Sequence, residues 1–231
     1  MTTYLSQDRL RNKENDTMTH PHSKMYKSKT FLLFSALLLV AGQASAAAAG
    51  NADAPAPYRV SSDCMVCHGM TGRNTLYPIV PRLAGQHKSY LEAQLKAYKD
   101  HFRADQNGEI YMWPVAQALD SAKITALADY FNAQKPPMQS SGIKHAGAKE
   151  GKAIFNQGVT NEQVPACMEC HGSAGQGAGP FPRLAGQRYG YIIQQLTYFH
   201  NGTRVNTLMN QIAKNITVAQ MKDVAAYLSS L

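Results

Sequence analysis

The sequence has few charges, few cysteines and no long apolar run. Only 16% of its 231 residues are charged, and only four are cysteine. The most apolar segment, residues 31–42, has twelve residues, whereas a membrane-spanning helix needs roughly 20. Lysine and arginine are scattered, so the net charge of +8 forms no basic cluster that would bind nucleic acid. The hydrophobic fraction of 44% predicts a chain that is mostly globular rather than disordered.

The apolar segment has the features of a secretory signal peptide. Lys27 and Lys29 precede it, and an A-x-A pattern ending at Ala46 follows it. A basic start, a short apolar core and small residues at the cleavage site are typical of export signals. We therefore expect cleavage after Ala46 rather than a membrane anchor, with the signal peptide at residues 25–46. Residues 1–24 are polar, and we interpret them as a disordered leader or as an extension upstream of a true start at Met25.

All four cysteines lie in two copies of one motif, CMVCH at residues 64–68 and CMECH at residues 167–171. C-x-x-C-H is the attachment signature of c-type haem. Its two thiols add across the two vinyl groups of one porphyrin, and the adjacent histidine then lies under the iron. The sequence therefore predicts two covalently bound haem c groups. The predicted attachment sites are Cys64 with Cys67 and Cys167 with Cys170, and the predicted proximal iron ligands are His68 and His171.

Three other interpretations of the cysteines fit less well. A zinc ribbon requires two C-x-x-C pairs some 15–20 residues apart, whereas Cys67 and Cys167 are separated by 100 positions. A thioredoxin-like redox pair requires a βαβ pattern, and no strand-rich stretch flanks either motif. Structural disulfides of an exported protein would not explain a histidine after each pair.

The two motifs belong to an internal repeat. The segment PRLAGQ at residues 81–86 recurs at residues 182–187, an offset of 101, and later matches such as Met112 with Met209 have an offset of 97. The change places a four-residue insertion in the first copy, between Arg103 and Met112. We predict a first domain at residues 47–135, a linker at 136–143, rich in Pro, Ser and Gly, and a second domain at 144–231.

Helical periodicity dominates both copies, so we predict an all-α fold. Apolar residues spaced i, i+3, i+4, i+7 mark a last helix in each copy: Ile124, Leu127, Ala128 and Phe131 in the first, and Met221, Val224, Ala225 and Leu228 in the second. Asp120 or Ser121, and Thr217, are the expected N-caps. An earlier stripe is formed by Leu91, Leu95, Tyr98 and Phe102, with Ile192, Leu196 and Phe199 as its counterpart. A further helix is expected at residues 147–156, whereas Pro55 and Pro57 leave its first-copy equivalent short or frayed.

A c-type iron with histidine on one side usually takes methionine or histidine on the other. Met112 and Met209 occupy the same repeat position, each in an expected irregular stretch ahead of the last helix. The histidines outside the motifs have no counterparts in the other copy, which argues against bis-histidine ligation in both. We therefore predict Met112 and Met209 as the sixth ligands. Thioether sulfur favours Fe(II), so the potentials should be high, and closed coordination favours an electron carrier over an enzyme.

The surroundings of the haems can also be predicted. Each proximal imidazole should donate its free N–H to a backbone carbonyl, for which Pro81 and Pro182 are the candidates. Five side chains are candidates for contact with haem propionates, with solvated surface as the alternative for each: Arg82, Arg103, Trp113, Arg183 and Arg204.

These motifs together resemble the c4-type dihaem cytochromes of bacterial periplasms, over essentially the whole mature chain. The resemblance rests on both C-x-x-C-H motifs, both PRLAGQ segments followed by Y-x-x-x-Q-L, the two methionines, and the PACMECHG run. It implies two tandem class I cytochrome c domains, each wrapped round one covalent haem, and the ligand pairs His68 with Met112 and His171 with Met209. It also implies that Pro81 and Pro182 accept hydrogen bonds from the imidazoles. It further implies rapid electron exchange between neighbouring haems and donation of electrons to a terminal oxidase.

The implied protein is a periplasmic electron carrier, freely diffusing or loosely associated with the membrane. Its expected partners are a terminal oxidase, a quinol–cytochrome c oxidoreductase or a dehydrogenase. One alternative is the cytochrome subunit of a dehydrogenase complex, such as flavocytochrome c sulfide dehydrogenase. Another is a dihaem peroxidase, which would need one iron with a displaceable ligand, whereas both copies keep their methionine.

Overall fold

The PRLAGQ repeat corresponds to two similar sets of helices along the chain. The computed structural model describes residues 63–73, 77–137 and 145–231, all within one compact unit. We call residues 63–137 the first half and residues 145–231 the second half. The predicted leader, signal peptide and most of the linker lie outside the described residues, as does any helix that precedes the first motif.

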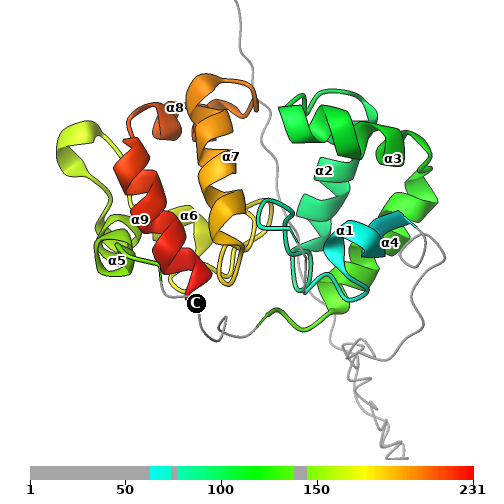
Figure 1. Ribbon diagram of the computed structural model, residues 1–231, viewed down its shortest axis with the longest axis horizontal. Coiled ribbons are helices and arrows are strands. Elements are labelled where there is room, and N and C mark those ends of the chain that lie inside the picture. Colours follow the sequence, from blue (N-terminus) through cyan, green and yellow to red (C-terminus); the bar gives the residue numbers. More distant parts are fainter. Residues whose placement is uncertain (1–62, 74–76, 138–144) are drawn as a thin grey trace, which may run out of the picture. The chain divides into compact units, whose positions relative to one another are not determined.

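The first half contains α1 (Met65–His68), α2 (Lys88–Lys99), the π-helical turn η2 (Gly108–Met112), α3 (Trp113–Gln117) and α4 (Ser121–Ala133) (Figure 1). The second half contains α5 (Ala148–Gln157), the 3-10 turn η3 (Thr160–Glu162), α6 (Met168–His171), α7 (Tyr189–Asn201), α8 (Thr207–Lys214) and α9 (Val218–Ser229). Among the described residues there is no strand beyond two isolated bridges, between Val159 and Val164 and between Ala178 and Phe181. The prediction of an all-α fold is therefore confirmed. No helix of the described residues is long and apolar enough to cross a membrane.

The last helix of each half buries the predicted apolar stripe. In the first half, Ile124, Leu127, Ala128 and Phe131 of α4 pack in a core cluster with Leu91 of α2. In the second half, Val224, Ala225 and Leu228 of α9 pack with Phe155 of α5 and Ile192 of α7. Met221 belongs to a further cluster with Val164 and Ile216. The repeat therefore forms two equivalent cores, one where α4 packs against α2 and one where α9 packs against α7.

Side-chain caps fix where the last helices begin. Asp120 accepts a hydrogen bond from the Lys123 backbone N–H at 2.8 Å at the start of α4. Thr217 and Gln220 form a reciprocal capping box at the start of α9. Such caps satisfy N–H groups that the first helical turn leaves without partners. Of the N-cap predictions, Asp120 and Thr217 are confirmed.

One residue of the predicted stripes is placed differently. Phe102 lies beyond the end of α2 and is 65% exposed. His101, which precedes it, has a φ of 59°, in the left-handed region that ends helices. The change of direction at His101 carries Phe102 away from the core, so the prediction that it extends the buried stripe is wrong.

The helix predicted at residues 147–156 is α5, one residue further along the chain. Gly151 of α5 is buried against α9, and a Cβ atom on it would lie 1.8 Å from the Asp223 carbonyl oxygen. The glycine therefore permits a close approach of the two helix backbones that any other residue would prevent.

Candidate haem sites

Each C-x-x-C-H motif forms a single helical turn. α1 and α6 both begin after the first cysteine and end at the histidine, and each is followed by a glycine with positive φ, 73° at Gly69 and 79° at Gly172. Residues three and four apart share one side of a helix. The turn therefore brings the first cysteine, the second cysteine and the histidine of each motif to the same side. No disulfide joins the four cysteines, and the described residues hold no cluster of three or more His, Cys, Asp or Glu that could bind a metal ion such as zinc.

The two motif histidines have equivalent environments. His68 Nδ1 lies 2.9 Å from the Pro81 carbonyl oxygen, and His171 Nδ1 lies 3.0 Å from that of Pro182. Both histidines are 8% exposed. Burial lowers the pKa of each imidazole, and the proline carbonyl opposes this only in part. The neutral ring then donates from Nδ1 and keeps Nε2 as its free nitrogen, the form that binds a metal. The prediction that Pro81 and Pro182 accept these bonds is confirmed.

A cavity of about 560 Å³ collects the remaining predicted haem-binding residues. Its lining is mainly apolar and includes Cys64, His68, Met112, Cys167, Cys170, His171 and Met209. Cys67 is half-buried but is not among the lining residues. Burial raises the pKa of the Cys167 thiol to about 11. An apolar cavity lined by three of the four motif cysteines, both motif histidines and both methionines fits a pair of haem c groups in residue type.

The structure corrects the expected setting of the two methionines. Met112 ends η2, and Met209 lies in the first turn of α8, so neither is in an irregular stretch. In the second half, the Asn206 side chain accepts a hydrogen bond from the Met209 N–H at 3.0 Å and starts α8. In the first half, Asp105 accepts from the Gly108 N–H at 3.2 Å, whereas Asn107, at the N-cap position of η2, makes no side-chain capping bond. Both bonds come from polar side chains ahead of the methionines, which apolar periodicity does not locate.

The four arginines with expected propionate contacts all line the cavity. Arg103 and Arg204 are only 5% and 7% exposed, so the alternative of solvated surface is wrong for these two. The Nε atoms of Arg82 and Arg183 are buried and have no hydrogen-bond partner in the described part of the chain. Unpaired buried donors of positive charge fit an anionic group such as a haem propionate.

Trp113 is placed differently from the expectation. Its indole N–H donates to the Arg103 carbonyl oxygen at 2.9 Å, and its ring stacks on His101 at a centroid distance of 4.0 Å. Indole has a single donor, which leaves none for a propionate. Trp113 instead ties the segment that carries Met112 to the end of α2.

A polar network that the sequence did not predict connects the two halves. Arg103 donates to the side-chain oxygens of Gln94 and Gln195 at 2.7 and 2.8 Å, and Arg204 donates to the same two oxygens at 2.9 and 2.7 Å. Arg103 also forms a 2.7 Å ion pair with the buried carboxylate of Asp105. The only sequence signal for this network is that Gln94 and Arg103 match Gln195 and Arg204 in the repeat.

The fold and the paired haem sites define a c-type cytochrome with two haem domains. The cytochrome c family model matches residues 47–135 and 148–231. The chain is 95% identical, over the full length of both chains, to cytochrome c-552 of Acidithiobacillus ferridurans. It is 97% identical to the solved cytochrome c4 of Acidithiobacillus ferrooxidans, with a TM-score of 0.72 over 74% of this chain and 99% of that one. The thiosulfate dehydrogenase electron acceptor of Thiomonas intermedia is 35% identical, covering 77% of this chain and 82% of the relative.

The chain therefore belongs to the cytochrome c4 family of dihaem c-type cytochromes. It carries two haem c groups and is an electron-transfer protein. The predictions of the family, of the two cytochrome c domains and of the cofactor are confirmed.

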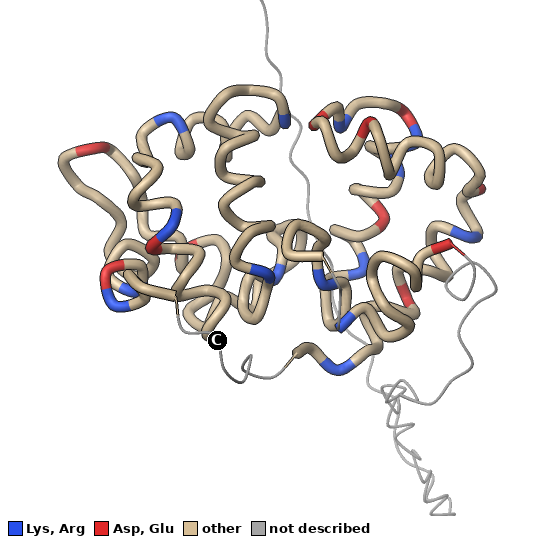
Figure 2. The backbone as a smooth tube through the Cα atoms, in the orientation of Figure 1, with Lys and Arg blue, Asp and Glu red and all other residues tan. Residues whose placement is uncertain are grey.

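Acidic and basic residues are interspersed along both halves (Figure 2), in keeping with the scattered charges of the sequence.

Proposed function

We propose that each half holds one haem by two thioether bonds and two axial ligands. In the first half these are Cys64, Cys67, His68 and Met112, and in the second half Cys167, Cys170, His171 and Met209. The main support is that each histidine donates Nδ1–H to a proline carbonyl while it lines the same cavity as the methionine of its half. The bound haem supplies an iron that alternates between Fe(III) and Fe(II).

The protein residues then have three tasks. The proline carbonyls hold each imidazole in one tautomer and orientation. The methionines close the sixth position, which leaves no iron site for a substrate and keeps the potential high. The apolar lining excludes water, so little reorganisation accompanies a change of charge on the iron. These properties suit electron transfer between proteins and not chemistry on a bound substrate.

We propose that the carrier works in the periplasm, reached through the export signal at residues 25–46, and donates electrons to a terminal oxidase of a respiratory chain. A quinol–cytochrome c oxidoreductase or a dehydrogenase would reduce it. A dehydrogenase as donor is favoured by the relative described as a thiosulfate dehydrogenase electron acceptor. The alternative function is that of a permanent cytochrome subunit of a dehydrogenase complex, such as flavocytochrome c sulfide dehydrogenase.

The ligand assignment is tested with Met112→Ala and Met209→Ala. We expect each variant to lower the midpoint potential of one haem and to let one reduced haem bind carbon monoxide, because the sixth position opens. Met221→Leu is the matched control, since Met221 is a buried methionine of the apolar core; it should leave both haems closed. If neither alanine variant bound carbon monoxide, the assigned methionines would be wrong.

The role is tested on the native protein. An optical and magnetic redox titration should give two low-spin haems, and a high-spin component would favour the peroxidase instead. Purification from the periplasm should yield the cytochrome alone, with rapid oxidation by purified terminal oxidase in stopped-flow measurements. Stoichiometric co-purification with a flavoprotein would support the alternative of a dehydrogenase subunit.

A further inference from the structure

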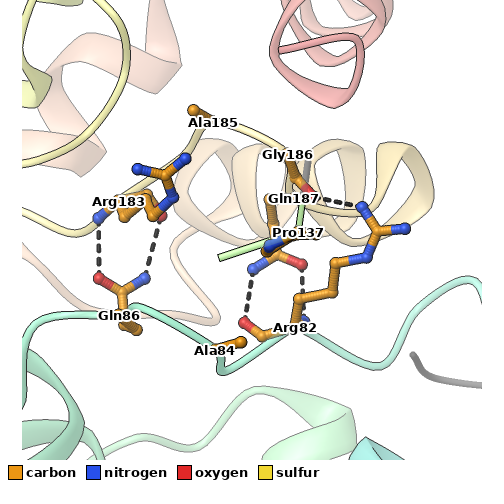
Figure 3. A pocket seen from close by; sticks show the side chains of 8 residues that line it. All are labelled: Arg82, Ala84, Gln86, Pro137, Arg183, Ala185, Gly186 and Gln187. Carbon is orange, nitrogen blue, oxygen red and sulfur yellow. Dashed lines mark hydrogen bonds between the residues drawn. The ribbon is translucent and has the colours of Figure 1, made fainter. Parts of the chain in front are cut away.

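The two PRLAGQ segments each end in a buried glutamine that reaches into the other half. Gln86 accepts a hydrogen bond from the Arg183 backbone N–H at 2.8 Å and donates to the Arg183 carbonyl oxygen at 3.0 Å. Gln187 makes the same two bonds to the backbone of Arg82, at 2.8 and 3.0 Å. Figure 3 shows the two glutamines side by side, each facing the arginine of the opposite segment. The exchange is reciprocal, and each glutamine is less than 8% exposed.

The backbone groups that the glutamines bind belong to the peptides that hold the histidines. The Arg183 N–H and the Pro182 carbonyl are the two ends of one peptide group, and the Pro182 carbonyl accepts from His171 Nδ1 at 3.0 Å. A continuous chain of hydrogen bonds therefore runs from His171 through this peptide to the Gln86 side chain. Such chains polarise their members, so that an acceptor on the N–H end strengthens the acceptor at the carbonyl end.

The same chain exists in the other direction. His68 Nδ1 lies 2.9 Å from the Pro81 carbonyl oxygen, and the Arg82 N–H of that peptide donates to Gln187. Each glutamine oxygen is also fixed by its own backbone, since Gln86 accepts from the His87 N–H at 3.0 Å and Gln187 from the Arg188 N–H at 2.9 Å. The side chains are therefore held in place toward the opposite peptide.

We propose that Gln86 and Gln187 are positioning residues, each of which strengthens the proximal-histidine hydrogen bond of the haem in the opposite half. The proposal rests on the proposed function, in which His68 and His171 are iron ligands. A histidine whose Nδ1–H is bound by a better acceptor is a more basic ligand, and a more basic ligand stabilises Fe(III). Gln86 thus lowers the potential of the second haem and Gln187 that of the first, so neither potential is a property of one half alone.

The test exchanges each glutamine for methionine, which keeps the length of the side chain. The exchange removes the two hydrogen bonds to the backbone of the opposite arginine. In Gln86→Met, we expect the His171 Nδ1 proton to move upfield in the NMR spectrum of the reduced protein, while that of His68 stays. The second haem's potential should rise, with a change of up to roughly tenfold in the equilibrium of electron exchange between the haems, or about 59 mV for one electron. Gln187→Met should instead move the His68 Nδ1 proton upfield and raise the potential of the first haem, while the His171 proton stays.

A matched control removes a hydrogen bond between the halves that does not touch either peptide. Asn107 donates to the Gln194 side-chain oxygen at 2.9 Å, so Gln194→Met should leave both imidazole protons and both potentials unchanged. If Gln86→Met does not fold, the shorter Gln86→Asn and the mirror variant Gln187→Met put the same question. A shift at the histidine of the variant's own half, equal shifts at both, or no shift would overturn the proposal.

The optical spectrum and mass of the wild-type protein separate this outcome from a failure of the proposed function. Suppose that the wild-type protein has two covalent low-spin haems and that the histidine Nδ1 protons do not shift in Gln86→Met or Gln187→Met. This result would overturn only the role of Gln86 and Gln187. A wild-type protein without His68 and His171 on iron would overturn both.

Discussion

Replacing Asp105 with asparagine should remove the carboxylate that pairs with Arg103 in the polar network between the two halves. The Asp105 carboxylate lies 2.7 Å from Arg103 Nε, and their side chains are 2% and 6% exposed. Asparagine has the same shape and keeps an oxygen for the Gly108 N–H. With that oxygen on Gly108, the amide N–H group faces the guanidinium, so Arg103 loses its carboxylate partner.

The expected cost follows from the burial of both partners. Removing one member of a buried ion pair typically costs about 3–5 kcal/mol. Arg103 retains neutral acceptors on Gln94 and Gln195, which places the expected loss at the lower end, about 3 kcal/mol. A loss of that size lowers the midpoint of thermal unfolding by roughly 6–12 °C for a chain of this length.

The assay is urea unfolding of the haem-loaded protein, followed by circular dichroism, because urea does not screen the ion pair. Asp129→Asn is the control, since Asp129 pairs with Lys88 at 2.7 Å with side chains 55% and 41% exposed, and exposed pairs contribute little. It should leave the unfolding midpoint unchanged. A loss below about 1 kcal/mol for Asp105→Asn, or an equal loss in both variants, would refute the reasoning from burial.

Three further results are expected. Gly151→Ala should destabilise the second half by about 1–3 kcal/mol, because its Cβ would meet the Asp223 carbonyl oxygen at 1.8 Å; an unchanged urea midpoint would contradict this contact. Thr217→Ala should cost about 1 kcal/mol through loss of the N-cap, measured in the same way, with Thr217→Ser restoring most of it. Hydrogen bonds from Lys123 lower the pKa of Asp120, so the charge of Asp120 should stabilise the protein above the ordinary aspartate pKa. This contribution should be lost as the pH falls through the lower folded value, so the midpoints of wild type and Asp120→Asn should converge in acid, and a pH-independent difference would count against it.

The features that the sequence predicted are those set within a few residues or by the repeat. Apolar spacing located α4 and α9, because burial of one helix face needs only a 3.6-residue period. Their N-caps followed, because Asp120 and Thr217 act on N–H groups three residues away. The proline carbonyls were predictable too, since the motif and the PRLAGQ segment recur together in both copies.

The features that were missed depend on partners far away in the chain. Asp105 lies in the stretch where the two copies differ in length, and the sequence alone does not show that Arg103 is buried beside it. Gln86 and Gln187 were visible as matching positions, but a match does not say which backbone a side chain will reach. Those hydrogen bonds span 97 and 105 residues, and they form only when the two halves meet.

The connection between the halves also carries an imbalance of charge. Asp105 compensates Arg103, whereas Arg204 donates hydrogen bonds to neutral groups: the side-chain oxygens of Gln94 and Gln195 and the Tyr90 hydroxyl. Burial alone would raise the pKa of Tyr90, yet Arg204 and Arg103 lower it overall, which indicates a positive potential at this point. A buried cation without an anion is costly, so a haem propionate is the partner that this site is expected to take.

The charge and the glutamines act on the irons in opposite directions. Positive charge near an iron favours Fe(II), whereas a strengthened imidazole hydrogen bond favours Fe(III). With the proposed ligation, both effects arise where the halves meet and not inside either one. At the offset of 101 that aligns Arg103 with Arg204, Asp105 corresponds to Asn206, so a neutral amide stands in the second half where the first half has a carboxylate. With the proposed ligation, we expect this difference in charge to make the two haem potentials unequal, so that a shared electron would favour one haem.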